Sequence, residues 1–151
     1  MALYYLETSA LVKLYVREQG TERLLQLAAS SLGNRFALLS ISQVEFRSAI
    51  RRRERNGDIT SIVAGLVLDR FQQHFEARFL RQGLTDAVLD GATEMIDRYA
   101  LRAYDAIQLS GYLVLRTTLG GEPTAFVCSD RLLLEAARSE RLQVFDPCAP
   151  N

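Results

Sequence analysis

The sequence has few of the residues that build zinc sites and disulfide frameworks. Among its 151 residues there are two cysteines, Cys128 and Cys148, and a single histidine, His74. Two cysteines at this spacing match neither a disulfide framework nor a zinc pattern, and one histidine cannot complete a zinc cluster. The composition therefore argues against a zinc-binding domain and against a small disulfide-stabilised secreted domain.

The sequence also lacks a charged leader followed by an apolar core, and no apolar run approaches the length of a membrane span. We therefore expect a cytoplasmic protein. No glycine-rich phosphate-binding loop follows an expected strand, which argues against a kinase or an ATPase. Acidic and basic residues balance at 18 each, so the net charge points to no anionic partner.

Short apolar runs alternate with helical segments along the chain. Strands are expected at residues 3–6, 36–41, 79–80, 124–128 and 144–145. Helices are expected at residues 10–15, 21–31, 43–55, 60–78, 104–119 and 131–139, with a further helix capped by Thr85. This alternation favours an α/β fold in which helices cover both faces of a parallel sheet.

The chain has the size and composition of one globular domain. At 48% hydrophobic residues it can bury a substantial core. We expect this domain to span residues 1–146, followed by a short C-terminal tail at residues 147–151.

Four acidic residues stand where strands end or helices begin. Glu7, Glu45 and Asp130 each lie at or just past the carboxyl end of an expected strand, and Asp105 lies at the start of a helix. If those strands are neighbours, the acids converge on the edge where open α/β sheets bind their ligands. Carboxylates that face one point repel each other unless a divalent cation lies between them.

Each acid also has a simpler interpretation as part of a helix start. Glu7 can end the first strand while Thr8 or Ser9 caps the next helix. Ser42 is the expected N-cap of the helix at residues 43–55, and Glu45 occupies its capping-box position three residues later. Asp105 and Asp130 can each be N-caps, and for Asp130 taken alone this is the stronger interpretation. His74 lies beside two phenylalanines, and we interpret it as an ordinary packed or half-exposed histidine.

A site built from oxygen ligands alone favours a hard cation, Mg²⁺ or Mn²⁺, over zinc. Such an ion suits phosphate chemistry, because it binds a phosphate oxygen and lowers the pKa of an attacking water. A phosphatase that works through an aspartyl-phosphate would need an aspartate after the first strand, and Glu7 does not fit that pattern.

Four segments, taken in order, resemble the PIN-domain family and most closely its VapC-like toxin ribonucleases. They cover nearly the whole chain: residues 5–15 (YLETSALVKLY), 44–45 (VE), 101–109 (LRAYDAIQL) and 126–130 (FVCSD). Each motif is short, so the resemblance rests on their order and spacing.

This resemblance implies a three-layer α/β/α fold with a central parallel sheet, and Mg²⁺- or Mn²⁺-dependent cleavage of RNA. It also implies a homodimer, and an antitoxin protein that inserts a segment into the active-site groove. On the family pattern, Glu7, Glu45, Asp105 and Asp130 are the catalytic, metal-binding cluster. Thr8, Ser9 and Ser129 would support that cluster through their hydroxyl groups.

One residue departs from the family pattern. Its first acid is ordinarily aspartate, and here it is Glu7. The extra methylene moves the carboxylate outward by about 1.5 Å, a displacement that can cost about a hundredfold in rate. Two hypotheses arise: a working nuclease, or a module that binds RNA or an antitoxin through a weakened metal site. A third is a metal-dependent phosphoesterase acting on DNA or a small phosphate ester.

Three arginines recur at four-residue spacing on the helix that begins near Glu45. Arg47, Arg51 and Arg55 form a stripe that could bind RNA phosphates or acidic side chains of an antitoxin. The same pattern also fits a solvated helix face of mixed charge.

Overall fold

The computed structural model describes residues 2–150, which form an α/β fold around a five-stranded sheet. The strands are β1 (Leu3–Leu6), β2 (Arg35–Leu39), β3 (Leu80–Gln82), β4 (Thr124–Val127) and β5 (Val144–Phe145). Their order in the sheet is β3-β2-β1-β4-β5, and every neighbouring pair is parallel. The first strand of the chain therefore lies in the middle of the sheet.

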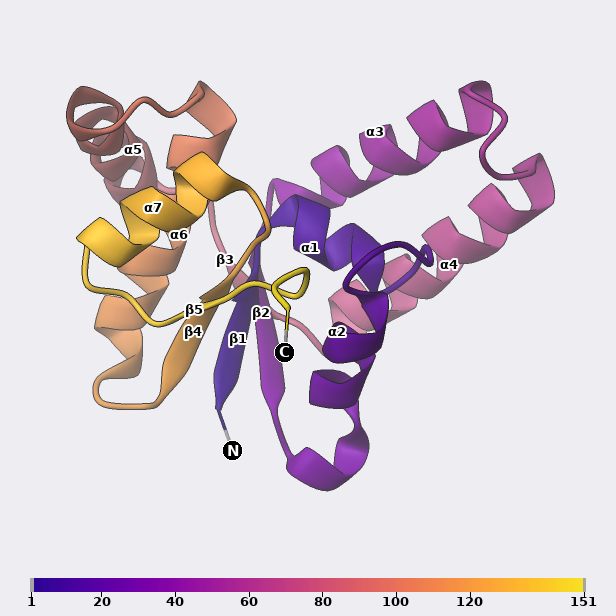
Figure 1. Cartoon of the computed structure of the whole chain (residues 1–151), viewed down its shortest axis with the longest axis horizontal. Helices are drawn as coiled ribbons and strands as arrows, with labels where there is room; N and C mark the ends of the chain where they lie inside the picture. The colour runs from indigo at the N-terminus through magenta and orange to yellow at the C-terminus, as the bar shows by residue number, and fades with distance from the viewer. Residues whose placement is uncertain (1, 151) are drawn as a thin grey trace.

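Helices cover both faces of this sheet (Figure 1). They are α1 (Thr8–Lys13), α2 (Thr21–Ala28), the 3-10 turn η1 (Ser30–Leu32), α3 (Ser42–Arg55), α4 (Ser61–Ala77), α5 (Asp86–Arg98), α6 (Ala103–Leu119) and α7 (Arg131–Ser139). In Figure 1, α1 to α4 lie to the right of the sheet and α5 to α7 to the left. The predicted three-layer α/β/α fold is confirmed.

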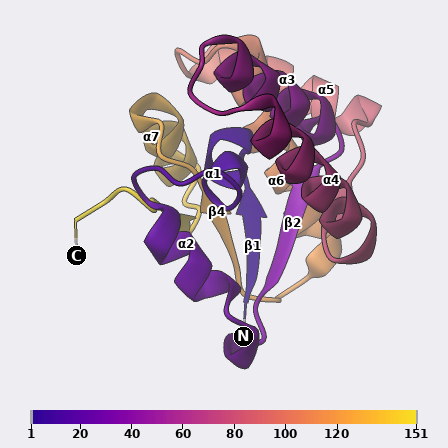
Figure 2. The same ribbon diagram turned by 90° about the vertical axis from the view of Figure 1, so that its right-hand side faces the viewer.

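Alternating side chains of the central strands divide the core between the two faces. Tyr5 and Phe126 are fully buried in one cluster with α5, α6 and α7. Leu6 and Val127 are fully buried in the other cluster, with α1 to α4. Strands buried on both faces read as continuous apolar runs, because neither face meets water. Figure 2 shows β1, β2 and β4 side by side, running in one direction.

Most predicted elements are present, with shifts at their ends. The last helix and strand have the predicted bounds, residues 131–139 and 144–145. The helix expected at 21–31 ends at Ala28 and is followed by a separate 3-10 turn. The strand expected at 36–41 ends at Leu39, because Ser40 and Ile41 turn the chain into α3.

The C-terminal segment runs back across the start of α2, and the structure describes it as far as Pro150. Arg23 on α2 donates from Nη1 to the backbone carbonyls of Asp146 (2.9 Å) and Ala149 (2.8 Å). Cys148 contacts the carbonyl of Gln19 through its Sγ, at 3.3 Å. These bonds attach the segment to the domain. Within residues 2–150, no helix combines the length and the apolarity needed to cross a membrane.

Gly111 allows α6 to approach the sheet closely, and this contact yields a test of the packing. A Cβ at this position would lie 2.7 Å from Tyr5 Oη and 2.9 Å from Leu39 Cδ1. We expect Gly111→Ala to lower the free energy of unfolding, because overpacking costs about 1–3 kcal/mol and outweighs a helix-propensity gain of about 1 kcal/mol. Urea unfolding followed by circular dichroism measures the change.

Gly65 in α4 is the matched control, because a Cβ there meets no atom within 4 Å. Gly65→Ala should raise the free energy of unfolding by about 1 kcal/mol. A stabilised Gly111→Ala protein would show that this contact does not constrain the α6 position.

Candidate active site

The four predicted acids reach the carboxyl edge of the sheet from four different elements. Glu7 directly follows β1 and is the N-cap of α1, and Asp130 follows β4 and is the N-cap of α7. Glu45 lies in the first turn of α3, the helix that follows β2. Asp105 lies in the first turn of α6. Since β1 pairs in parallel with both β2 and β4, these strand ends lie together.

Glu7 is buried, and its carboxylate is held by Ser9. Only 7% of the residue is exposed. One carboxylate oxygen accepts from the Ser9 backbone N–H at 2.9 Å and the other accepts from Ser9 Oγ at 2.5 Å. Burial raises the pKa of Glu7, the bonds from Ser9 lower it, and the charges of Asp105 and Glu45 raise it further. Glu7 therefore lies close enough to both Asp105 and Glu45 for their charges to act on it.

Glu45 is half-buried and is held by two neutral donors through its Oε1. Thr8 Oγ1 lies 3.1 Å from this oxygen and Gln108 Nε2 lies 2.8 Å from it. The buried hydroxyl of Ser42 completes the group, 3.2 Å from Thr8 Oγ1 and 3.0 Å from Gln108 Nε2. The structure thus places Thr8 against Glu45, and Ser9 against Glu7.

The expected capping role of Ser42 is wrong. The N-cap of α3 is Ile41, and no side chain caps this helix. Ser42 is fully buried, and its hydroxyl turns inward to Thr8 and Gln108 instead. A buried hydroxyl costs free energy unless it is hydrogen-bonded, and this site supplies two partners.

Asp105 is buried, with 6% of the residue exposed, and it is not the cap of α6. The N-cap is Arg102, so the capping interpretation of Asp105 is wrong. Arg102 Nε lies 3.4 Å from Asp105 Oδ2, and its guanidinium lies 5.0 Å from the centre of the Tyr104 ring. Burial raises the pKa of Asp105, Arg102 lowers it, and the charge of Asp130 raises it.

Asp130 is half-buried and caps α7, as the simpler interpretation predicted. Its Oδ1 accepts from the Leu133 backbone N–H at 3.4 Å. Its charge also raises the pKa of Asp105, so it lies near Asp105 while it caps α7. The neighbouring Ser129 turns away, because its Oγ lies 3.4 Å from Cys148 Sγ in the C-terminal segment.

Gln108 and Tyr5 belong to this site and were not predicted, like Ser42 and Arg102. Gln108 is one turn after Asp105 on α6, and its Oε1 accepts from Tyr5 Oη at 3.1 Å. Burial, together with the charges of Glu45 and Glu7, raises the pKa of Tyr5 well above its usual value, so its hydroxyl stays protonated. The signal available in the sequence was a glutamine beside Leu109, inside the apolar stripe that contains Asp105.

The oxygen ligands that these residues offer are of the kind that a hard divalent cation prefers. All the candidate ligands are carboxylates, with hydroxyl and amide groups around them, and the buried charges oppose one another. Two of these carboxylates already bond to other side chains of the protein. Glu7 accepts a hydrogen bond from Ser9, and Asp105 pairs with Arg102. In the described part of the chain, no three Asp, Glu, His or Cys side chains are arranged to hold one ion.

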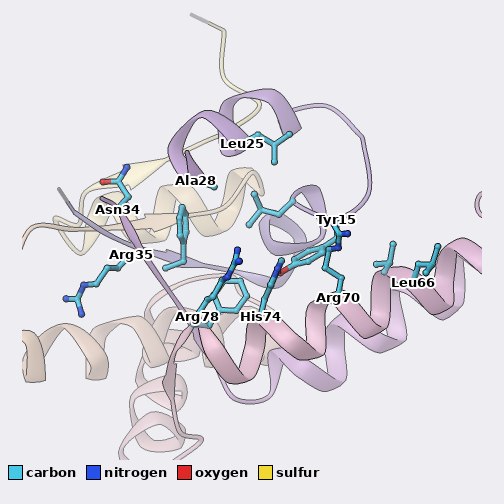
Figure 3. Close-up of a pocket in the computed structure, with 13 residues that line it drawn as sticks. Tyr15, Leu25, Ala28, Asn34, Arg35, Leu66, Arg70, His74 and Arg78 are labelled. Atoms are coloured by element: carbon cyan, nitrogen blue, oxygen red, sulfur yellow. The ribbon is translucent and has the colours of Figure 1, made fainter. Parts of the chain in front are cut away.

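A cavity of about 640 Å³ lies elsewhere, between α2, the start of β2 and α4 (Figure 3). None of the four acids is among the described residues that line it. His74 Nδ1 lies 2.7 Å from Tyr15 Oη in this cavity. Burial and the charges of Arg78 and Arg70 lower the pKa of His74. His74 is half-exposed and packed against a tyrosine, as predicted for a packed or half-exposed histidine.

Comparison with known proteins identifies a relative along nearly the whole chain. No family model matches the sequence. The chain is 32% identical over 148 residues to "Ribonuclease VapC35" of Mycobacterium tuberculosis, covering 96% of this chain and 97% of that protein.

Three solved structures share the fold. VapBC2 from Rickettsia felis, bound to a promoter DNA fragment, has a TM-score of 0.63 and 15% identity, and the match covers 95% of this chain and 98% of that one. FitAcB from Neisseria gonorrhoeae has a TM-score of 0.66 and 15% identity, with 95% and 97% of the two chains covered. A toxin–antitoxin complex from Klebsiella pneumoniae has a TM-score of 0.64 and 14% identity, with 97% and 98% covered. These identities are low, so the three structures show the fold alone. Together with the full-length similarity to a curated ribonuclease, they show that this chain belongs to the VapC-like ribonuclease branch of the PIN-domain family.

Proposed function

We propose that this chain is a metal-dependent endoribonuclease, the toxin of a toxin–antitoxin pair, which hydrolyses RNA phosphodiesters at the carboxyl edge of its sheet. The observation that carries this proposal is the gathering of acids from four elements at that edge, in a member of a ribonuclease family. Buried like charges are costly, and a bound cation would offset that cost.

In this proposal Glu7, Glu45, Asp105 and Asp130 hold Mg²⁺ or Mn²⁺. When bound, the ion would polarise the scissile phosphate and lower the pKa of the attacking water. Ser9 holds Glu7 in place, and Thr8 holds Glu45. Ser129 has no part in this arrangement, because its hydroxyl faces Cys148.

In this proposal Arg102 binds the substrate. Its side chain is 70% exposed beside the buried Asp105, and it lies over the ring of Tyr104, which is itself exposed. A guanidinium next to the acids could bind an RNA phosphate and keep the substrate backbone beside them.

An antitoxin partner is supported by the fold relatives, one of which is described as a toxin–antitoxin complex. We propose that a segment of such a protein occupies the acidic edge, that the chain is a homodimer, and that it acts in the cytoplasm. Of the three arginines on α3, Arg51 is less available to bind RNA or an antitoxin, because it pairs with Glu54 at 3.0 Å. Arg47 and Arg55 remain exposed on α3.

A second candidate is a module that binds RNA or an antitoxin without efficient cleavage. The observation that favours it is the engagement of both Glu7 carboxylate oxygens by Ser9, which competes with a metal.

Removal of the Asp105 carboxylate tests catalysis. Asp105→Asn should lower Mn²⁺-dependent RNA cleavage by at least about a hundredfold, because it removes a buried carboxylate from the acidic edge. Cleavage of a labelled RNA by the purified protein measures this. The control is Asp90→Asn, which neutralises an exposed acid on α5 and should cleave like the parent. Full activity in Asp105→Asn would contradict the proposed function.

The same substitution tests the stability of the metal-free protein. The raised pKa of Asp105 means that the folded protein holds this proton more tightly than the unfolded chain does. Its contribution to stability is therefore greatest at acidic pH, below the ordinary pKa of an aspartate, and falls as the pH rises through the raised pKa. Near pH 7, metal-free Asp105→Asn should melt at a higher temperature than the parent.

Added Mn²⁺ should reverse this order. It should raise the melting temperature of the parent and raise that of Asp105→Asn much less, since a ligand stabilises the folded state in proportion to its binding. Equal shifts in the two proteins would show that Mn²⁺ binds away from Asp105.

The Glu7→Asp variant separates the two candidate functions. Aspartate keeps the charge and is a good N-cap, so under the proposed function we expect cleavage within about tenfold of the parent. A gain on the order of a hundredfold would instead favour a binding module whose metal site is weakened by the glutamate. Initial cleavage rates at saturating Mn²⁺ make the comparison.

A further inference from the structure

Gln108 is a neutral side chain at the centre of the acidic edge. It is fully buried, with 1% exposed, on the same helix as Asp105 and one turn further on. Glutamine is mostly an exposed residue, and burying its carboxamide is costly unless each polar atom is hydrogen-bonded. The contacts of this side chain therefore need a specific explanation.

The carboxamide bonds to residues of three other elements. Its Nε2 lies 2.8 Å from Glu45 Oε1, 3.0 Å from Ser42 Oγ and 3.1 Å from Thr8 Oγ1. Its Oε1 accepts from Tyr5 Oη at 3.1 Å. One side chain of α6 thus connects β1, α1 and α3.

The charge of Glu45 determines which way the amide faces. With the amide reversed, its oxygen would lie against the Glu45 carboxylate oxygen, and two acceptors would repel each other. With the amino group facing Glu45, the bond is charge-assisted and stronger than one between neutral groups. Tyr5 then donates to the other end and keeps the amide in this orientation.

The same bonds determine how Glu45 is presented. Both donors, Thr8 and Gln108, reach its Oε1. Within residues 2–150, this leaves Oε2 as the oxygen of Glu45 that can face a ligand. Because Gln108 and Thr8 are neutral, they orient this carboxylate without adding a positive charge that would compete with a cation.

We propose that Gln108 is a positioning residue of the active site: its carboxamide, supported by Tyr5, holds Glu45 and Thr8 so that Glu45 is oriented to bind the divalent ion. This inference rests on the proposed function. Residues that orient metal ligands typically contribute 10–100-fold in metal affinity or activity, although they do not touch the ion.

The test measures Mn²⁺ affinity directly, by titration calorimetry or by the electron paramagnetic resonance signal of free Mn²⁺. Gln108→Met keeps the length of the side chain and removes its hydrogen bonds. We expect this variant to bind Mn²⁺ at least about tenfold more weakly than the parent, and to cleave RNA correspondingly more slowly.

Ser110→Ala is the matched control. Ser110 is also buried on α6, but its Oγ donates to the Val88 carbonyl at 2.6 Å, outside the group around Glu45. This variant loses a buried hydrogen bond and should bind Mn²⁺ like the parent. Equal affinities in Gln108→Met and the parent, or equal losses in Gln108→Met and Ser110→Ala, would overturn the inference.

A double-mutant cycle tests whether the effect passes through Glu45. In a Glu45→Gln background, Gln108→Met should weaken Mn²⁺ binding by much less than tenfold, because the carboxylate that it positions is gone. The same loss in both backgrounds would mean that Gln108 acts through general packing. If Gln108→Met does not fold, Gln108→Glu preserves the shape, replaces the donor with an oxygen facing Glu45, and should weaken Mn²⁺ binding in the same direction.

Mn²⁺ binding and RNA cleavage by the parent protein show whether a negative result contradicts the proposed function or only the role of Gln108. A parent protein that neither binds Mn²⁺ nor cleaves RNA contradicts the proposed function. A parent that does both, with a Gln108→Met variant that matches it, contradicts only the role of Gln108.

Discussion

Parallel pairing of β1 with its two neighbours is the constraint on which the acidic edge depends. Tyr5 is in register with Ala37 of β2 and with Phe126 of β4, so the three strands end at one level. The residues after each strand must therefore lie at the same edge of the sheet. Glu7, the start of α3 and Asp130 are brought together by backbone hydrogen bonding, before any side chain contributes. Only Asp105 depends on helix packing, because α6 has to approach the sheet closely at Gly111.

The resulting edge is electrostatically costly, and neighbouring groups offset part of the cost. Burial raises the pKa of both Glu7 and Asp105, and the charge of a neighbouring acid raises each pKa further. Ser9 bonds to the first, the exposed Arg102 pairs with the second, and the neutral Thr8 and Gln108 hold Glu45. Most of these partners are uncharged, so the edge keeps its negative charge. A domain that retains such charge against its own stability is suited to attract a cation and, through it, a phosphate group.

Capping and ligand binding are compatible at this edge. Asp130 caps α7 and lies near Asp105, and Glu7 caps α1 and lies near both Asp105 and Glu45. For Asp130, the capping and metal-binding interpretations that the sequence left open are therefore not alternatives. For α1 the expected cap, Thr8 or Ser9, is wrong, because Glu7 itself is the N-cap. A carboxylate that comes after a parallel strand and begins a helix can accept backbone N–H groups with one oxygen and remain close to a second acid. Asp105 is not a helix cap, because Arg102 is the N-cap of α6.

The sequence by itself determined the fold class, the parallel sheet and the helices, because these depend on local periodicity. It predicted four acids near the carboxyl ends of the strands, and their role as a metal site stays a prediction. It also carried the resemblance to a ribonuclease family that the full-length relative supports. Only the tertiary structure revealed Gln108 and Tyr5 in the site, the inward turn of Ser42, and Ser129 facing the C-terminal segment. Tyr5 and Gln108 are 103 positions apart along the chain, and their hydrogen bond exists only where α6 packs against β1. A pattern read along the chain does not contain a contact of this kind, because the packing of layers creates it.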